Sequence, residues 1–395
     1  MAKTRQIFSK LVKELDNNKI LLLVWPRQVG KTTLLKQLQA EVKDKKTHFI
    51  NLEFADTRAL LDKHPINVFE LTGIDRNAQQ IIFIDEIQYL NNPSNFLKLL
   101  YDEFHENMKL VVSWSSSFYI DQKFKDSLMG RKRMFEIITL NFEEFLDFRD
   151  EHKIKELLFA EKKIPLWYKD RIEELFLEYI TYGGYPEVVL LPDRERKKRK
   201  LEQLSLDYIK KDIYDANIQE VDKFFAILKI LATQTWELVN ASDLAKTLQI
   251  DTKTVEKYLY IMRKSYCISL TKPFWTNVKA ELTKMPKVYF FDLGLRNSFL
   301  NNFENINERL DKWGFFENVV RREFGFKYGF DNLKYRRKQD KNEVDIIVKE
   351  QKAYEVKFTK NLIKESKYKA FREKYPAINL TFITFEDFLG TLAGL

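Results

Sequence analysis

A short segment near the N-terminus places the strongest constraint on how this chain can fold. Residues 20–24 (ILLLV) are apolar and of strand length, residues 25–33 read WPRQVGKTT, and a helical pattern follows over residues 32–42. A strand, a turn containing Gly-Lys-Thr and a helix together are typical of a phosphate-binding loop, in which backbone N–H groups hold phosphate oxygens. The segment therefore predicts an α/β fold with a P-loop and a parallel sheet.

Three further apolar runs continue this pattern within the first 150 residues. Residues 48–52, 81–84 and 110–112 are short enough to be strands, and polar residues follow each of them. Ligands of parallel sheets bind at the carboxyl ends of the strands. We therefore predict a P-loop domain over residues 1–150 with its site at this edge.

The second run ends in an acidic pair, Asp85-Glu86, about 50 residues after the Gly-Lys-Thr turn. In this arrangement Lys31 would neutralise the β- and γ-phosphates of ATP, while Thr32 and Asp85 would hold Mg²⁺. Glu86 would act as general base on the attacking water. Either motif alone occurs by chance, but the two in this order predict ATP and Mg²⁺ as cofactors.

Other residues complete the predicted site. The nucleotide-binding set is Pro26, Arg27, Gln28, Val29, Gly30, Lys31, Thr32 and Thr33. Ser115, in a serine-rich segment after the strand at 110–112, is our candidate for a contact to the γ-phosphate or the attacking water, and a plain turn is the alternative. Arg131 is a candidate for completing the site of a neighbouring subunit, although a solvated arginine explains it as well.

Length and composition limit the remaining possibilities. A chain of 395 residues is too long for one core and suggests two to four domains. The single cysteine excludes a disulfide framework and a cysteine-rich zinc site. No run of about 18 uncharged apolar residues occurs, so we expect no membrane association and a cytoplasmic location. The net charge of +9 suits a polyanionic partner such as DNA, but a compositional bias rich in lysine would produce it too.

The middle of the chain is mainly helical. We predict a helical lid subdomain over residues 151–222 and a winged helix over residues 223–275. In the second of these, Ala241-Ser242-Asp243 and Asp251-Thr252-Lys253 each open a helix. Thr252, Lys253, Thr254 and Lys257 would face a DNA groove if the second helix reads DNA. Docking of another protein is the alternative for such a module.

The C-terminal region, residues 276–395, carries a second group of charged residues. Asp345 lies on one predicted strand, and Glu355 and Lys357 lie two residues apart on the next, so that the last two project from the same face. Two carboxylates and a lysine can hold Mg²⁺ and activate water at a phosphodiester. Alternating charges on an exposed hairpin are the alternative interpretation. The pattern resembles the PD-(D/E)xK nuclease core, in which Glu317 would match the helical acidic ligand.

Several long motifs resemble those of a known family. They are PRQVGKTTLL at residues 26–35, FIDEIQYL at 83–90, GGYPEVVL at 183–190, KMPKVYFFDLGLRN at 284–297, FFENVV at 315–320 and NEVDIIV at 342–348. Together they resemble the prokaryotic AAA-type ATPases that pair an AAA_14 domain with a DUF4143 domain. The resemblance implies an ATPase joined to a winged helix and a nuclease-like C-terminal fold.

Tryptophan stands where this family carries glycine at Trp25, and also at Trp114, Trp236 and Trp313. The chain has only 11 glycines, where average usage of about 7 per cent would give roughly 28. Some bacterial lineages read the UGA codon as glycine, and we hypothesise that several of these tryptophans are glycines in the organism. A tryptophan at position 25 would also penalise a turn with positive φ.

These features predict a Mg²⁺-dependent ATPase whose nucleotide state controls a DNA-contacting C-terminal half. One alternative is a nucleotide-binding switch with little turnover that acts through protein contacts. Another is a nuclease gated by the ATPase. DNA, a second copy of the chain and another protein are the partners that we expect.

Overall fold

The computed structural model describes residues 3–26, 28–73, 75–114, 128–275, 281, 284–337 and 343–394. The chain divides into two compact units, one of residues 1–138 with 264–266 and the other of residues 139–263 with 267–395. Among the described residues, no helix combines the length and the apolar character needed to cross a membrane.

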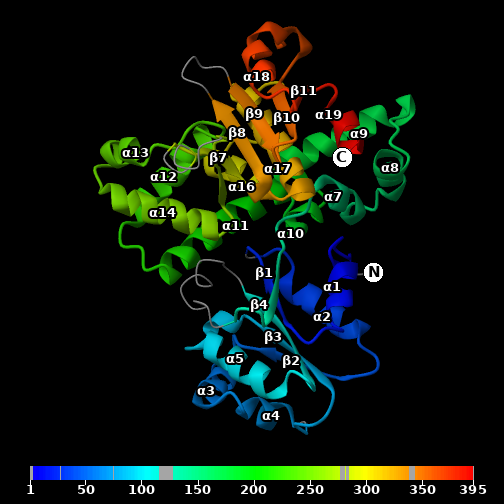
Figure 1. Ribbon diagram of the computed structural model, residues 1–395, viewed down its shortest axis with the longest axis vertical. Coiled ribbons are helices and arrows are strands. Elements are labelled where there is room, and N and C mark those ends of the chain that lie inside the picture. The colour runs from blue at the N-terminus through cyan, green and yellow to red at the C-terminus, as the bar shows by residue number, and fades with distance from the viewer. Residues whose placement is uncertain are drawn as a thin grey trace. The chain divides into compact units, whose positions relative to one another are not determined.

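The first unit is built on a parallel sheet of five strands in the order β2-β3-β4-β1-β5 (Figure 1). The strands are β1 (Ile20–Val24), β2 (Lys46–Asn51), β3 (Gln80–Asp85), β4 (Met108–Trp114) and β5 (Lys132–Glu136). Every residue of the three inner strands is buried, as expected for strands covered on both faces. The predicted α/β class with a parallel sheet is therefore confirmed for this unit.

Helices flank this sheet. They are α1 (Phe8–Glu14), α2 (Lys31–Glu41), α3 (Ala55–Lys63), α4 (Asn67–Thr72), the 3₁₀ turn η1 (Ile87–Tyr89) and α5 (Pro93–Phe104). Helices α2 and α5 both pack against the sheet (Figure 1). The start of α5 is encoded locally, because Asn92 accepts a hydrogen bond from the Asn95 N–H at 3.1 Å and Pro93 occupies the first turn.

The second unit opens with helices that surround a large apolar core. They are α7 (Phe142–Phe148), α8 (His152–Lys155), the π-helical turn η2 (Glu156–Ala160), α9 (Leu166–Tyr182), α10 (Pro186–Val189) and α11 (Arg194–Asp215). Three further helices and an antiparallel strand pair follow: α12 (Val221–Thr233), α13 (Ala241–Leu248), α14 (Thr252–Lys264), β6 (Ile268–Thr271) and β7 (Lys287–Phe290). The two helices predicted to start after residues 240 and 251 are thus present.

The C-terminal part of this unit combines a sheet with helix α17. Its elements are α16 (Leu293–Leu300), α17 (Lys312–Tyr328), η3 (Phe330–Asn332), β8 (Leu333–Arg337), β9 (Glu343–Val348), β10 (Lys352–Lys357), η4 (Lys360–Leu362), η5 (Glu365–Tyr368), α18 (Lys369–Lys374), β11 (Asn379–Thr384) and α19 (Phe388–Gly394). The sheet order is β11-β10-β9-β8, with β10 and β11 parallel and the other pairs antiparallel. Helix α17 packs against β8, β9 and β10.

The glycine pair of the GGYPEVVL motif marks a close backbone approach inside the second unit. Gly183 has a φ of 76°, and a Cβ at Gly184 would overlap the carbonyl oxygen of Leu140. The Gly184 N–H donates to Asp292 Oδ2 at 2.8 Å, and the Leu140 N–H donates to the Gly184 carbonyl at 2.7 Å. A side chain at position 184 would clash with the Leu140 backbone, so glycine is required there. The motif therefore has a structural role in joining these two segments.

Candidate functional site

The loop between β1 and α2 has the backbone of a phosphate-binding turn. Gly30 lies in the left-handed region with a φ of 88° and is the residue that precedes the first turn of α2. No side chain caps the helix at Gly30, and the N–H groups of a first helical turn have no acceptor within the helix, so this turn can donate hydrogen bonds to an anion. The loop lies beside the carboxyl end of β1, which has β4 on one side and β5 on the other.

The functional side chains meet at the carboxyl ends of β3 and β4. Lys31 forms an ion pair with Glu86, and both side chains are about 10% exposed. Thr32 donates a hydrogen bond from Oγ1 to Asp85 Oδ2 at 2.7 Å. The structure therefore brings together four predicted site residues from two segments that lie far apart in the sequence.

Ser113 is a site residue that the sequence prediction missed. Its hydroxyl donates to Asp85 Oδ1 and accepts a hydrogen bond from the Glu86 N–H at 2.8 Å. Ser115, which the sequence analysis predicts to contact the γ-phosphate or the attacking water, lies outside the described residues. The available signal for Ser113 was its position directly after the apolar run at residues 110–112, and the structure shows its hydroxyl to be completely buried.

Glu86 is held by its backbone as well as by its side chain. It has a φ of 60°, in the left-handed region that residues other than glycine seldom adopt. Its carboxylate accepts a hydrogen bond from Gln88 in η1, another contact that the sequence analysis did not predict. Strained residues of this kind cluster at functional sites, where surrounding contacts hold them in place.

The other predicted loop residues have different environments. Pro26 and Val29 are buried, Thr33 is exposed, and exposed Gln28 has a φ of 60°. Arg27 lies outside the described residues. These residues contribute to the turn through their backbone. Lys31 and Thr32 are the loop residues whose side chains contact the acidic pair.

Arg131 contacts its own chain. Its guanidinium donates two hydrogen bonds to the carboxylate of Asp102 on α5, at 2.6 and 3.2 Å. This exposed pair raises the pKa of Arg131, chiefly through the hydrogen bond to Asp102. The structure thus gives Arg131 a partner within the subunit, and a role in a neighbouring site stays a prediction.

A pocket of about 480 Å³ opens next to the loop. Thr32 and Lys36 of α2 line one part of it, and Phe49 and Asn51 of β2 line another. The volume lies within the range of small-molecule sites. It gives a ligand held at the loop room to extend along α2 and β2.

Comparison with known proteins agrees with this geometry. Residues 17–146 match the family model described as an AAA domain. This part of the chain is similar to AAA domains. The match spans the loop, the acidic pair and Ser113, so the predicted AAA-type P-loop domain is confirmed at this level.

Relatives align with the AAA domain and with much of the remaining chain. An uncharacterized protein of Methanocaldococcus jannaschii, MJ1544, is 28% identical, and the alignment covers 98% of this chain and 87% of that protein. An uncharacterized protein of Haemophilus influenzae is 23% identical over 88% of this chain and 84% of its own length. The solved structure of a RuvB variant from Thermotoga maritima has 17% identity and a TM-score of 0.36, and covers 67% of this chain and 86% of that chain.

The predicted DUF4143 assignment is wrong. Residues 173–305, beyond the AAA domain, match the domain of unknown function DUF8612. The motifs GGYPEVVL and KMPKVYFFDLGLRN both lie inside this match. Gly184 of the first motif donates its N–H to Asp292 of the second, so these motifs report a packing contact of this fold.

Trp25 follows β1 directly and is completely buried. It is not among the described residues with positive φ, so the backbone strain expected for a tryptophan at this position is absent. Its indole Nε1 is buried and has no hydrogen-bond partner. An unpaired buried N–H costs about 1–3 kcal/mol.

A second group of predicted residues lies in the other unit. Glu317 on α17, Asp345 on β9 and Glu355 on β10 are all buried, and Lys357 forms an ion pair with Glu355. Asp345 Oδ2 accepts a hydrogen bond from the Val356 N–H at 2.9 Å. The structure therefore brings the predicted nuclease-like residues into one neighbourhood.

Lys287 on β7 is a member of this group that the sequence analysis did not single out. Its Nζ donates to Glu317 Oε1 at 2.9 Å, forms an ion pair with Glu343, and lies 3.6 Å from Asp345 Oδ1. Tyr289, two residues further on the strand, donates to Glu317 Oε1 at 2.5 Å. In the described part of the chain, no three His, Cys, Asp or Glu residues are arranged to hold a metal ion.

Burial and crowding change the proton affinities in this cluster. Burial raises the pKa of Glu317 to about 7, and the charge of Asp345 adds to the effect. Burial and Asp345 likewise raise the pKa of Glu355 to about 8, although Lys357 opposes the shift. Burial alone would lower the pKa of Lys287, but the neighbouring carboxylates, Glu317 first among them, raise it well above its usual value. The neighbouring carboxylates therefore stabilise the charged form of Lys287.

Proposed function

We propose that the AAA-type domain binds and hydrolyses ATP with Mg²⁺, and that the nucleotide state controls a DNA-contacting C-terminal half. The observation that carries the proposal is the convergence of Lys31, Thr32, Asp85, Glu86 and Ser113 at one edge of the sheet. These residues supply a phosphate cation, metal ligands and a general base within direct contact of one another.

The oxygen donors present fit Mg²⁺. Thr32 Oγ1 and the Asp85 carboxylate are hard oxygen ligands in direct contact, the type that Mg²⁺ prefers. When bound, the ion would offset the negative charge of the β- and γ-phosphates. Ser113 orients Asp85, because it hydrogen-bonds the oxygen of that carboxylate that Thr32 does not contact.

The Lys31–Glu86 ion pair suggests how binding and hydrolysis are linked. An incoming triphosphate offers Lys31 a stronger anionic partner than a single carboxylate. Transfer of the Lys31 ammonium to the phosphates would allow the Glu86 carboxylate to accept a proton from the attacking water. The N–H of Glu86, fixed by Ser113, keeps the carboxylate at the end of β3.

The DNA-contacting role is assigned to α12, α13, α14 and the β6–β7 pair. Three helices followed by an antiparallel hairpin are the arrangement of a winged helix, and Lys253 and Lys257 are exposed on α14, the candidate reading helix. Asp251 fixes the start of this helix by accepting a hydrogen bond from the Lys253 N–H at 3.0 Å. Docking of a protein partner on the same helix is the rival role.

Two substitutions separate binding from chemistry. We expect Lys31→Ala to weaken ATP binding, because the phosphate charge is no longer offset. Glu86→Gln should retain ATP binding and lower turnover by roughly 10²–10⁴-fold, the usual contribution of a general base. Fluorescence titration measures the nucleotide affinity. Phosphate release, with and without duplex DNA, measures the turnover.

Glu53→Gln is the matched control, because Glu53 is an exposed carboxylate in the same domain. DNA-stimulated hydrolysis would support the complete proposal. Tight ATP binding with wild-type turnover no faster than that of Glu86→Gln would reject hydrolysis and favour the nucleotide-binding switch.

A further inference from the structure

The buried cluster around Lys287 carries an inference beyond the ATPase. Lys287 is 2% exposed, and its ammonium is surrounded by carboxylates from two other elements, Glu317 on α17 and both Glu343 and Asp345 on β9. In a site of the nuclease type, a divalent cation would lie among such carboxylates. In this protein, the Lys287 ammonium lies at that position among the carboxylates.

Donors of the protein engage Glu317 Oε1 and Asp345 Oδ2, whereas Glu355 Oε2 is buried without a hydrogen-bond partner among the described residues. Glu317 Oε1 accepts hydrogen bonds from Lys287 and Tyr289, and Asp345 Oδ2 accepts one from the Val356 N–H. Glu355 is paired with Lys357. A metal ion would have to replace these donors and would lie close to a like charge in a buried environment, where charges are poorly screened.

The backbone that carries Lys287 is fixed in place, so the lysine cannot leave the cluster without breaking other contacts. It stands on β7, which pairs with β6 and is fixed to α17 by two hydrogen bonds between Asn318 and the backbone of Phe290, at 2.8 and 3.0 Å. Removal of the Lys287 charge would leave several carboxylates facing one another in a buried space.

We propose that Lys287 is the resident cation of this acidic cluster and excludes divalent metal ions from it. The Lys287 ammonium offsets the negative charge of the carboxylates, as a metal ion does in a nuclease. Its ion pairs also connect the β6–β7 strand pair to α17 and β9. The cluster is then a structural joint, and phosphodiester cleavage at Asp345 and Glu355 is blocked in the intact chain.

Calorimetric titration of the nucleotide-free full chain with Mn²⁺ tests the proposal. We expect Lys287→Met to gain one Mn²⁺ site per chain relative to wild type, with at least tenfold higher affinity than any wild-type binding at the cluster. Lys287→Arg keeps the positive charge and should gain no site. Lys352→Met, an exposed lysine on neighbouring β10, is the matched control and should also gain none.

Addition of Asp345→Asn to Lys287→Met should abolish the gained site, which locates it in the cluster. The ligands of the AAA domain are the same in all these proteins, so differences in stoichiometry report the cluster alone. A folded Lys287→Met protein that binds no additional Mn²⁺ would overturn the proposal.

A measurement on the wild-type residue at position 287 covers the case in which Lys287→Met does not fold, as judged by circular dichroism. Wild type and Asp345→Asn should then give the same Mn²⁺ isotherm. A wild-type Mn²⁺ site that disappears in Asp345→Asn would show that the cluster accepts a metal ion beside Lys287, and the proposal would be wrong.

Discussion

Ser113 shows how much a single hydroxyl can organise in this protein. It is completely buried, and it contacts both the Asp85 carboxylate and the backbone N–H of Glu86. These two hydrogen bonds restrain the Asp85 side chain and the backbone at Glu86. The geometry of the proposed hydrolysis therefore depends on a residue that need not contact the nucleotide.

We expect Ser113→Ala to lower ATP turnover by roughly 10–100-fold. The lost hydrogen bonds involve a charged group and are worth about 1.5–3 kcal/mol, and each 1.36 kcal/mol corresponds to a factor of ten in rate. Steady-state phosphate release measures this effect. The control is Ser242→Ala at an exposed position of α13. A Ser113→Ala protein with unchanged turnover and ATP affinity would remove this residue from the site.

Trp236 is the tryptophan whose backbone best fits the glycine hypothesis. It has a φ of 78°, and this conformation is fixed because its N–H donates to the Val288 carbonyl at 2.8 Å. A Cβ with a bulky ring is strained there, whereas glycine is not. Trp25 offers the weaker argument of an unpaired buried indole N–H.

Mass spectrometry of the native protein tests this directly. We expect the peptide that contains position 236 to carry glycine, because that residue relieves the left-handed backbone. The peptide that contains Trp167, which the hypothesis does not include, is the internal control and should carry tryptophan. A tryptophan mass at position 236 would refute recoding at that position.

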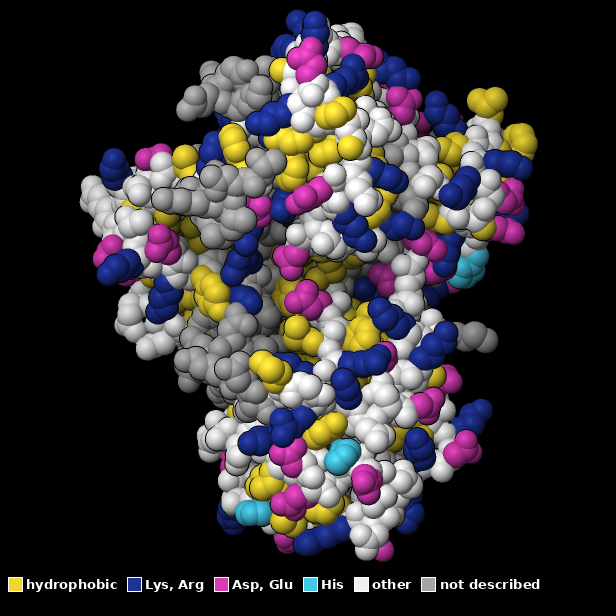
Figure 2. All heavy atoms as spheres, in the orientation of Figure 1, with side chains coloured by type: hydrophobic (Ala, Val, Ile, Leu, Met, Phe, Trp, Pro, Cys, Tyr) yellow, Lys and Arg dark blue, Asp and Glu magenta, His cyan; other side chains and the backbone are white. Residues whose placement is uncertain are grey.

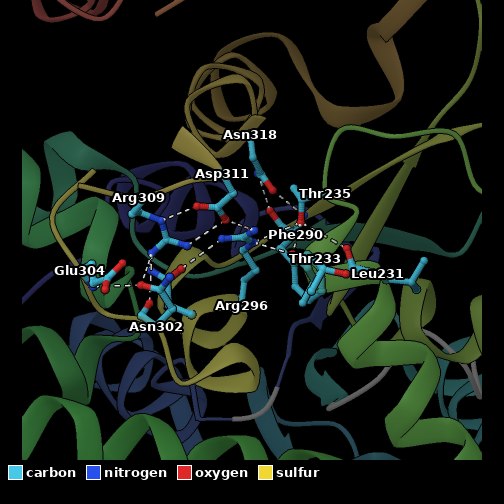
Figure 3. A network of polar contacts seen from close by, with 12 residues as sticks. Leu231, Thr233, Thr235, Phe290, Arg296, Asn302, Glu304, Arg309, Asp311 and Asn318 are labelled. Atoms are coloured by element: carbon cyan, nitrogen blue, oxygen red, sulfur yellow. Dashed lines mark hydrogen bonds and ion pairs between the residues drawn. The ribbon is translucent and has the colours of Figure 1, made fainter. Parts of the chain in front are cut away.

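At the scale of elements, buried arginines join the helices of the second unit. Figure 3 shows Arg296 of α16 and Arg309 converging on Asp311, which precedes α17. The distances to the Asp311 carboxylate are 2.5 Å from Arg296 Nη2 and 2.8 Å from Arg309 Nε. Arg296 Nε also donates to the Ala232 carbonyl of α12 at 3.0 Å. The network thus fixes α12, α16 and α17 to one another.

Loss of the Asp311 carboxylate should destabilise this network. We expect Asp311→Ala to lower the free energy of unfolding by about 1.5–3 kcal/mol, because two buried guanidinium groups lose their anionic partner. Urea unfolding at neutral pH measures the change. Asp170→Ala, at an exposed position of α9, is the control. An unchanged unfolding midpoint for Asp311→Ala would contradict a stabilising role.

The same contact predicts a pH dependence. Burial opposes ionisation of Asp311, but the hydrogen bond from Arg309 and the charge of Arg296 outweigh it and lower the pKa to about 2. Because this folded-state pKa lies below the unfolded value of about 4, the contribution is complete above that value and is lost as the pH falls from about 4 to 2. The stability difference between wild type and Asp311→Ala should shrink in that window.

At the scale of the whole molecule, the excess of basic residues is not gathered on the face shown in Figure 2. Lysine and arginine side chains are interspersed there with aspartate and glutamate. The net charge of +9 therefore marks no single basic region on this face, and the DNA contact proposed above is tested at one residue, Lys253 on α14.

The salt dependence of DNA binding measures that contact. We expect Lys253→Ala to weaken binding of duplex DNA and to reduce the slope of log K against log salt concentration by about one, because one phosphate contact is lost. Lys169→Ala, an exposed lysine on α9, should leave the slope unchanged. Equal slopes for wild type and Lys253→Ala would favour protein docking on α14.

Much of the architecture is predictable from local patterns. The strand at Ile20–Val24 was predicted with the bounds that the structure has, and the helix after Gly30 to within one residue, because an apolar run and a Gly-Lys-Thr turn determine them locally. Strand β5 was not anticipated. Its mixture of exposed and half-buried residues carries no apolar run, and it becomes a strand by pairing with β1.

The phosphate loop and the acidic pair are predictable from the sequence, because each is a run of adjacent residues at a strand end. The contact of Ser113 with Asp85 and the position of Lys287 among Glu317, Glu343 and Asp345 become visible in the folded chain. The physical reason is the same in both cases. The partners come from different strands and helices, and their electrostatic interaction exists only when packing buries them within a few ångströms of one another.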